Sequence, residues 1–436
     1  MRLARTGGGA DGGLHPRTPL PMTTAALSAP APAVPPAGGP DRIASVDALR
    51  GFDMFWILGG DVLVYALHRA SGDPVTAAIA EQMDHCAWAG FHFYDLIFPL
   101  FVFIAGVSTV FSLTRIIARE GRAVAVRRIV RRGMLLVVLG ILCYGGIGGG
   151  WDQVRLLGVL QRIGLAYLFA GLLFCFLDWR GLAAVCLALL LGYWALMAWV
   201  PIRDVRLDPD EFERRAATTG IYDEHQLFTA TTTTVAGRYE PGYNLSDHLD
   251  FQYLPGRKWD RYYDPEGLLS TLPAIATCLL GVFAGLLLQR RDLADRRKLT
   301  WLLAAATAAI ALGWLWDLEF PVVKKLWTSS FVLVAGGWSA LLLAVFFWLI
   351  DMRGWRTWAA PFTWIGMNAI AAYLVVDGGL VDVRGVAKRL VGGPVAGFLD
   401  AHLAGGAGEV GVAVGGLGLI LLLVWFLHRR QIHLRL

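Results

Sequence analysis

Residues 329–350 read SSFVLVAGGWSALLLAVFFWLI, a run of 22 residues without a charged side chain. About 20 apolar residues in an α-helix are enough to cross the hydrocarbon core of a bilayer. Further apolar runs recur along the chain, and the ten expected spans lie at roughly 51–68, 91–113, 133–149, 158–177, 181–200, 267–288, 299–316, 329–350, 360–377 and 409–427. The sequence therefore predicts an all-α fold, a polytopic membrane helical bundle of about ten transmembrane helices.

The composition agrees with this class of protein. Of the 436 residues, 56% are hydrophobic and 17% are charged, and the mean hydropathy is +0.54. These values exclude a soluble enzyme, a disordered protein and a weakly alternating outer-membrane barrel. The formal charge of +5 comes from basic residues in short segments between the apolar runs, so it indicates membrane topology rather than a nucleic-acid partner. The five cysteines contain no CxxC pair, and neither a metal site nor a disulfide framework is expected.

The basic segments also predict how the chain is threaded. Arginines are concentrated in residues 115–132, 289–298 and 428–436, which all fall on the side of the N-terminus when ten spans are counted. The positive-inside rule then places both termini in the cytoplasm. Residues 1–44, rich in Pro, Gly, Ala and Thr, are predicted to form a disordered cytoplasmic tail without a signal peptide, and 45–436 the transmembrane domain.

Two polar segments interrupt the apolar pattern. The longest, about 201–264, is expected as a non-cytoplasmic loop, and its aromatic residues among Asn, Asp and His suit either sugar stacking or an ordinary loop cap. The segment 378–408 is apolar but broken by charges, so an interfacial or re-entrant helix is expected there.

Ionisable residues at the start of the second span and within the first span suggest a catalytic or binding site. His85, His92 and Asp95 lie within eleven residues of one another at its non-cytoplasmic start, where imidazole and carboxylate groups can transfer a proton or an acyl group. The alternative for Asp95 is a helix N-cap. Asp61, in the outer half of the first span, is either a site carboxylate or the partner of an arginine.

Three further polar residues are placed at the spans that follow. Arg162 begins the fourth span and either clamps a substrate or snorkels to the interface. Glu266 stands with Asp264 at the mouth of the sixth span, where helix capping is the alternative, and Asn368 lies inside the ninth, where it can bridge helices. A common depth for these groups predicts a site, but the residues alone do not separate a transporter from an enzyme.

Six blocks of sequence carry a more specific signal. In order they resemble the membrane core of the heparan-alpha-glucosaminide N-acetyltransferase family and its bacterial relatives, from residue 43 to nearly the C-terminus. The blocks are IASVDALRGFDMFWILGGD (43–61), MDHCAWAGFHFYDLIFPLFVFIAGVS (83–108), GVLQRIGLAYL (158–168), YDPEGLLSTLPAI (263–275), WTSSFVLVAGGW (327–338) and PFTWIGMNAIAAYL (361–374). The resemblance implies that an acetyl group from cytoplasmic acetyl-CoA passes to the amino group of a glucosamine on the opposite face of the membrane.

The resemblance also implies roles for single residues. The family's catalytic histidine block matches His85 and Trp88, so His85 is expected to be catalytic and His92 not. Asp61 replaces an asparagine of the lysosomal enzyme and is expected as the nearest acidic partner of His85. Substrate binding is expected from Trp88, Asp95, Arg162, Glu266 and Asn368. Coenzyme A binding is expected from Arg50, Arg131 and Arg132, which otherwise only set the topology.

The function predicted from these features is a transmembrane acetyltransferase of a bacterial inner membrane, with acetyl-CoA as donor. Its acceptor is expected to be an amino sugar or a cell-wall glycan rather than heparan sulfate, because the lumenal domain of the lysosomal enzyme has no counterpart here. The family suggests a homodimer in the lipid bilayer. The alternatives are a membrane transporter of sugars or organic anions, in which the polar cluster binds solute, and an acyltransferase acting on a hydroxyl.

Overall fold

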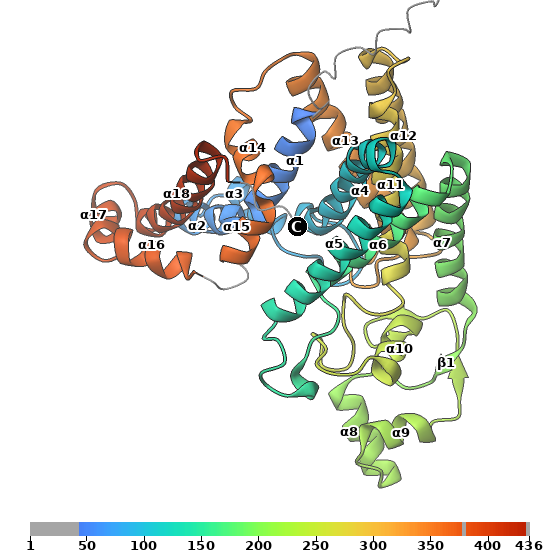
Figure 1. The fold of residues 1–436 in the computed structure, drawn as a ribbon. Coiled ribbons are helices and arrows are strands. Elements are labelled where there is room, and N and C mark those ends of the chain that lie inside the picture. The colour runs from blue at the N-terminus through green and yellow to red at the C-terminus, as the bar shows by residue number, and fades with distance from the viewer. Residues whose placement is uncertain (1–42, 377–380, 433–436) are drawn as a thin grey trace, which may run out of the picture. The chain divides into compact units, whose positions relative to one another are not determined.

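Helices form most of the described structure in a computed structural model, which covers residues 43–376 and 381–432 (Figure 1). The helices are α1 (Ala44–Phe55), α2 (Asp61–Ser71), α3 (Pro74–Glu81), α4 (Phe93–Glu120), α5 (Arg122–Cys143), α6 (Val159–Phe176), α7 (Trp179–Trp199), α8 (Pro209–Thr219), α9 (Glu224–Ala230), α10 (Leu245–Tyr253), α11 (Thr271–Gln289), α12 (Asp295–Trp316), α13 (Ser329–Phe346), α14 (Ala360–Met367), α15 (Ala369–Val376), α16 (Val383–Val391), α17 (Pro394–His402) and α18 (Ala407–Arg429). The predicted all-α class is confirmed. Apart from its last two residues, the predicted tail 1–44 lies outside the described residues.

Seven helices in the described ranges are long and apolar enough to cross a membrane. They are α4, α6, α7, α11, α12, α18 and the continuous helix Ser329–Met352, which joins α13 to a π-helical end (Phe347–Met352). These helices coincide with seven of the ten predicted spans, because an apolar run of this length has no way to satisfy its backbone in lipid except as a helix. The chain is a polytopic helical membrane protein.

The other three predicted spans are helical but interrupted or charged. Residues 51–68 fall on α1, a π-helical turn (Trp56–Gly60) and α2, with a kink at Gly59, whose φ of 128° is open to glycine but not to other residues. Residues 133–143 of the run 133–149 belong to α5, whose first half is rich in arginine, and residues 144–149 form turns. Asn368 divides the run 360–377 into α14 and α15.

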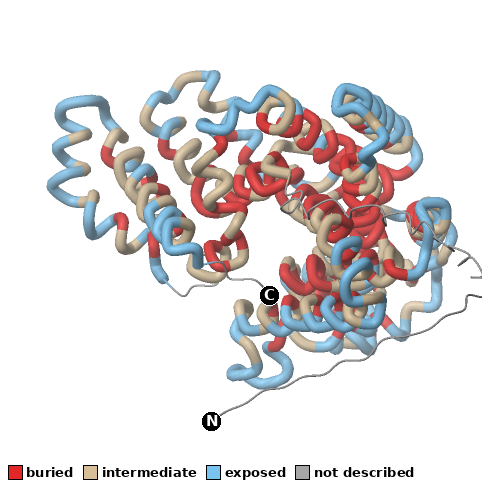
Figure 2. The backbone as a smooth tube through the Cα atoms, turned by 45° about the horizontal axis from the view of Figure 1, so that its top comes forward, coloured by how far each residue is buried: buried red, intermediate tan, exposed pale blue. Residues whose placement is uncertain are grey.

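The core is built where α4 and α11 pack backbone to backbone. A Cβ atom at Gly106 would overlap the carbonyl group of Cys278, and one at Gly281 would overlap that of Phe103. Small residues allow helices in a membrane to approach this closely, and the gain is van der Waals packing. Figure 2 shows the buried residues gathered in the interior of the helical bundle.

We expect the variant Gly281→Leu to unfold at a lower temperature than the wild type in detergent. Its side chain has to displace the α4 backbone, and overpacking a tight interior costs about 1–3 kcal/mol. Gly192→Leu on α7 is the matched control, since no heavy atom lies within 4 Å of a Cβ placed at that position. Equal transition temperatures for the two variants would contradict the packing described here.

The polar segment between α7 and α11 is folded. Two antiparallel pairs of short strands, β1 (Ile202–Arg203) with β2 (Thr234–Val235) and β3 (Tyr239–Glu240) with β4 (Tyr243–Asn244), accompany α8, α9 and α10 at one end of α7 (Figure 1). Asp208 begins α8 by accepting the N–H groups of residues 210 and 211. A small apolar core of its own lies beneath these helices and is formed by Val205, Leu207, Phe212, Ala216, Leu227, Phe228, Phe251 and Tyr262. We call residues 201–270 the outer segment.

The predicted interfacial segment 378–408 contains α16 and α17, and its residues 378–380 lie outside the described ranges. Each helix has nine residues, which gives a length of about 14 Å. Neither helix is long enough to cross a bilayer by itself. Both pack against α18.

Candidate active site

The start of α4 organises the candidate site. The first N–H groups of a helix need acceptors, and Asp95, at the third helical position, supplies one to the backbone N–H of His92 at 3.1 Å. The same oxygen accepts the N–H of Cys86 at 3.2 Å, which folds the preceding loop over the helix end. The capping role considered for Asp95 is therefore present, and it leaves the second carboxylate oxygen available.

The second oxygen of Asp95, Oδ1, holds His85 and lies 2.8 Å from Nδ1 of the imidazole. The Asp95 side chain is only 1% exposed, whereas the His85 side chain is 51% exposed. A carboxylate at Nδ1 favours the tautomer that carries its proton there, so the lone pair of the imidazole lies on Nε2. His85 can then act as a general base or as a nucleophile.

Lys324 completes the cluster and was not identified from the sequence. Its Nζ lies 3.0 Å from Nδ1 and 3.2 Å from Nε2 of His85, and 3.4 Å from Oδ1 of Asp95. Burial lowers the pKa of the Lys324 ammonium group, although the Asp95 charge opposes this shift. A signal existed: two adjacent lysines directly precede the apolar run 329–350.

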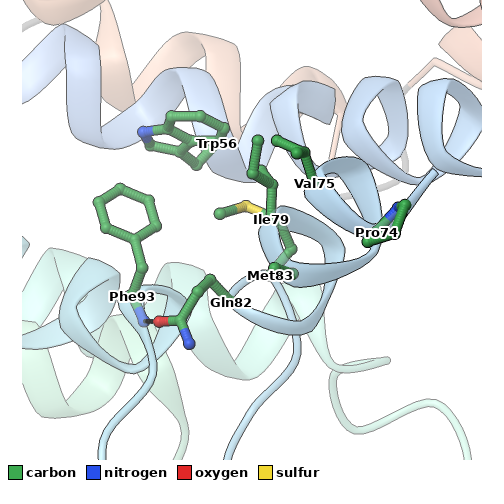
Figure 3. A pocket seen from close by; sticks show the side chains of 8 residues that line it. Trp56, Pro74, Val75, Ile79, Gln82, Met83 and Phe93 are labelled. Carbon is green, nitrogen blue, oxygen red and sulfur yellow. Dashed lines mark hydrogen bonds between the residues drawn. The ribbon is translucent and has the colours of Figure 1, made fainter.

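The loop that carries His85 is joined to the loop that carries Lys324. The N–H of Gly90 donates to the carbonyl of Val322 at 2.9 Å, and Ala89 and Val323 form an isolated antiparallel bridge. On its other side, the side chain of Gln82 accepts the N–H of Phe93 at 3.1 Å, beside an apolar groove between α3 and α4 (Figure 3). The catalytic candidates are thus fixed by backbone contacts from two directions.

A cavity of about 290 Å³ opens beside the cluster. Its polar lining comes from His85, Lys324, Glu266 and the two tyrosines 94 and 144. The apolar lining is Met54, Ile57, Ile97, Phe98, Phe101, Val159, Leu160, Ile163, Ala369, Ile370 and Tyr373. A mostly apolar cavity with a few convergent polar groups is the usual form of a small-molecule site.

Asp61 is not the nearest acid to His85, so that prediction was wrong. Its Oδ2 accepts a hydrogen bond from the hydroxyl of Tyr94 at 3.4 Å, and the Tyr94 ring lies 5.1 Å from the imidazole. Asp61 therefore reaches His85 only through one intervening side chain. The depth of a residue along a helix could be read from the sequence, but the direction in which it faces could not.

A buried ion-pair network lies behind Glu266. Arg155 donates to Oδ2 and Oδ1 of Asp264 at 2.9 and 2.7 Å, and to Oε2 of Glu266 at 2.6 Å. The Arg155 side chain is 2% exposed and lies between the rings of Tyr144 and Trp259. Burial raises the pKa of Glu266, while neighbouring guanidinium charges act in the opposite direction. Sequence reasoning missed Arg155, which stands in a short polar linker with no motif.

Arg162 supports this network from within the bundle. It is fully buried, donates to the hydroxyl of Ser270, and lies over the ring of Trp327 at 4.9 Å. Its Nε and Nη1 have no hydrogen-bond partner among the described residues, and its charge acts on Glu266. Arg162 neither snorkels to the surface nor lines the cavity.

The remaining predicted residues lie away from the cavity. The indole N–H of Trp88 donates to the carbonyl of Tyr239 at 2.7 Å and so attaches the outer segment to the His85 loop. Asn368 ends α14, and the residues after it line the cavity. The backbone carbonyl of His92 accepts the N–H of Asp95 at the start of α4, and Nδ1 of His92 lies 3.0 Å from the carbonyl of Asp84.

The three arginines expected at coenzyme A occupy α1 and α5. Arg50 donates to Ser108 at 2.5 Å and to the Gly366 carbonyl at 3.3 Å, which ties α1 to α4 and α14. Arg132 lies over the ring of Tyr167 at 4.9 Å, and Arg131 is exposed.

The outer segment should lose stability as the pH rises from about 4 to 8. Burial raises the pKa of Asp250 to about 7 and that of Asp247 to about 8. Between the ordinary aspartate value and these values, the folded protein binds protons that the unfolded chain has released, so unfolding becomes easier by at most about 1.4 kcal/mol per pH unit and group. Asp250 matters to the site because it accepts the N–H of Leu268 at 2.9 Å and so holds the turn that carries Glu266.

The measurement is the thermal transition of the purified protein at pH 5 and pH 8. Asp250→Asn should reduce the difference between the two values, and the exposed Asp210→Asn should leave it as in the wild type. A wild-type transition that rises with pH over this range would contradict the prediction.

The sequence matches known proteins over much of its length. Residues 42–207 match the family model described as heparan-alpha-glucosaminide N-acetyltransferase, catalytic. The human heparan-alpha-glucosaminide N-acetyltransferase is 28% identical over 367 residues, which cover 77% of this chain and 52% of the human protein. The mouse protein of the same name is 29% identical over 328 residues, which cover 66% of this chain and 48% of the mouse protein. The chain thus spans about half the length of these curated relatives.

Proposed function

We propose that this integral membrane protein transfers an acetyl group from acetyl-CoA to the amino group of a glucosamine-type sugar, because residues 42–207 match the heparan-alpha-glucosaminide N-acetyltransferase catalytic family model. The donor binds on the cytoplasmic face and the acceptor on the opposite face. The membrane is the bacterial inner membrane, both termini are cytoplasmic, and the protein forms a homodimer.

The observation that carries this proposal is the cluster of His85, Asp95 and Lys324 at the polar end of the cavity. In the reaction the sugar ammonium loses a proton, a C–N bond forms to the acetyl carbonyl carbon, and the C–S bond to coenzyme A breaks. The products are the acetamide, the thiol and one proton. Nε2 of His85 takes the amine proton or carries the acetyl group, while Asp95 stabilises the imidazolium.

The neighbouring side chains have complementary roles. Lys324, with its Nζ 3.2 Å from Nε2 of His85, offers a positive charge where the acyl oxygen becomes negative. Glu266 lines the same cavity and binds the acceptor ammonium before it is deprotonated. Asp95, at 1% exposure, holds His85 and does not contact the substrate. Trp88, Arg162 and Asn368 position the elements around the acceptor.

The donor site is proposed at arginines of α1 and α5. Arg131 and Arg132, near the middle of α5, are offered for the phosphates of coenzyme A, because a guanidinium group pairs with phosphate in two parallel hydrogen bonds. Arg50, near the middle of α1, is proposed at the same site.

The test is acetyl transfer from radiolabelled acetyl-CoA to glucosamine by the purified protein in detergent. Label is expected in N-acetylglucosamine for the wild type and equally for His402→Ala, which changes an exposed histidine remote in sequence from the site. In a second assay, unlabelled N-acetylglucosamine replaces glucosamine as the acceptor, and it has only hydroxyl groups to acylate. Transfer of label to this acceptor, with no transfer to glucosamine, would mean O-acylation. Sugar uptake into liposomes without acetyl-CoA, and no transfer to any amine, would establish the transporter instead.

A further inference from the structure

A second cavity lies among α2, α16, α17 and α18, and the proposed acetyl transfer does not use it. Its volume is about 410 Å³, larger than that of the active-site cavity, and within the range of ligand sites in proteins. We call it the α16 cavity. Its apolar wall consists of Leu58, Gly59, Val62, Ala66, Val376, Val383, Ala387, Ala396, Gly408, Val412, Ala413, Gly416, Leu417 and Ile420.

The acids of the α16 cavity already have partners. Glu409 accepts from Nε of Arg69 at 2.6 Å, and Oδ1 of Asp400 accepts the N–H of Gly408 at 2.7 Å. Arg69 thus pairs with the charge of Glu409, while the carboxylate of Asp400 accepts a backbone N–H at the start of α18.

The cations of α16 are not compensated in the same way. Arg384 and Lys388 are four residues apart, so they lie one helical turn apart on the same side of α16, and both line the cavity. Within the ranges 43–376 and 381–432, neither side chain forms an ion pair within 4.0 Å; the charge of Arg384 acts at longer range on Asp61. The cavity thus combines an apolar wall with two cations that can receive an anion.

We propose that the α16 cavity binds an anionic phospholipid, with its phosphate at Arg384 and Lys388 and acyl chain along the apolar wall. Basic pockets between membrane helices recognise anionic headgroups in this way. One wall of the cavity is α18, a candidate membrane span, and phospholipids are the amphiphiles that a membrane-spanning helix meets. The groove of about 600 Å³ beside Trp56 and Phe93 offers no such site, because no charged side chain lines it (Figure 3).

The test is native mass spectrometry of the full-length protein, delipidated in detergent and titrated with dioleoyl phosphatidylglycerol or dioleoyl phosphatidylcholine. We expect saturable binding of the anionic lipid, and about tenfold to thirtyfold weaker binding by the double variant Arg384→Gln/Lys388→Gln. Arg389→Gln is the matched control, since this exposed cation of the same helix does not line the cavity. The exchange variant Arg384→Lys/Lys388→Arg keeps both positive charges, so it should bind phosphatidylglycerol as the wild type does. Such binding would show that the glutamine variant loses binding through its charge and not through its fold.

Several outcomes would overturn the proposal. Equal binding of the two lipids by the wild type would show that charge does not select the occupant. Unchanged phosphatidylglycerol binding by the double variant, or an equal loss in Arg389→Gln, would place the lipid elsewhere. Displacement of phosphatidylglycerol by the same concentration of glycerol phosphate would identify a soluble anion as the ligand.

Discussion

Replacing His85 by alanine should lower the rate of acetyl transfer by about 10²–10⁴-fold, the usual contribution of a positioned general base. Nε2 of His85 is the basic atom at the polar end of the cavity whose orientation is fixed from behind, by Asp95 at Nδ1. Without the imidazole, an amine proton has no acceptor in the geometry required for attack. The loss should appear in kcat, because the proton is transferred only on the way to the transition state.

The measurement compares initial rates of the wild type, His85→Ala and His402→Ala at saturating glucosamine. The His85 side chain is 51% exposed, so its removal should leave insertion and the thermal transition nearly unchanged. A His85→Ala protein that retains more than about a tenth of the wild-type rate would remove His85 from the mechanism.

The two roles of His85 predict different intermediates. If the imidazole carries the acetyl group, wild-type protein mixed with labelled acetyl-CoA and no acceptor should retain label after rapid quenching, and His85→Ala should not. If the imidazole acts only as a base, neither protein should be labelled. Either result is compatible with the rate loss above, and the pair of measurements separates the two routes.

The helices could be predicted from the sequence where length and apolarity alone decide them. The run 329–350 has no charge, so a helix is its only stable form in lipid, and the structure places one at Ser329–Met352. The kink at Gly59 and the division at Asn368 were not predicted, because a single residue inside an apolar run hardly changes its average hydropathy. Such breaks depend on how neighbouring helices pack.

The site was predictable only within one stretch of sequence. His85 and Asp95 are ten residues apart, so the same local fold that caps α4 also joins them. Lys324 is 239 positions from His85 and reaches it only through the packing of two loops, which no local pattern reveals. Asp61 was predicted to be the acidic partner of His85 from its depth in the membrane, but Asp95 makes that contact instead.

Replacing Asp95 by asparagine should be almost as damaging as loss of His85, with an expected decrease in kcat of about 10²–10⁴-fold. The carboxylate accepts the N–H groups of Cys86 and His92 and also holds the imidazole. An amide cannot accept all of these bonds, because its NH₂ group is a donor.

The matched control is Asp84→Asn, which changes an exposed acid of the same loop whose carboxylate accepts from the hydroxyl of Tyr65. It should retain the wild-type kcat and thermal transition. A purely structural role for Asp95 would lower the thermal transition and leave kcat of the folded protein unchanged, so an Asp95→Asn protein with the wild-type kcat would contradict the positioning role.

The double variant Asp95→Asn/Lys324→Met separates stability from catalysis. Asp95→Asn leaves the partly buried Lys324 ammonium without the anion that lies 3.4 Å away, and a charge that loses its partner in a partly buried place is destabilising. Removing that charge should recover part of the lost thermal stability, so the two substitutions should not be additive. Activity should remain low, because both the anion that orients His85 and the cation proposed to face the acyl oxygen are then absent. Recovery of activity together with stability would mean that Asp95 serves only to neutralise Lys324.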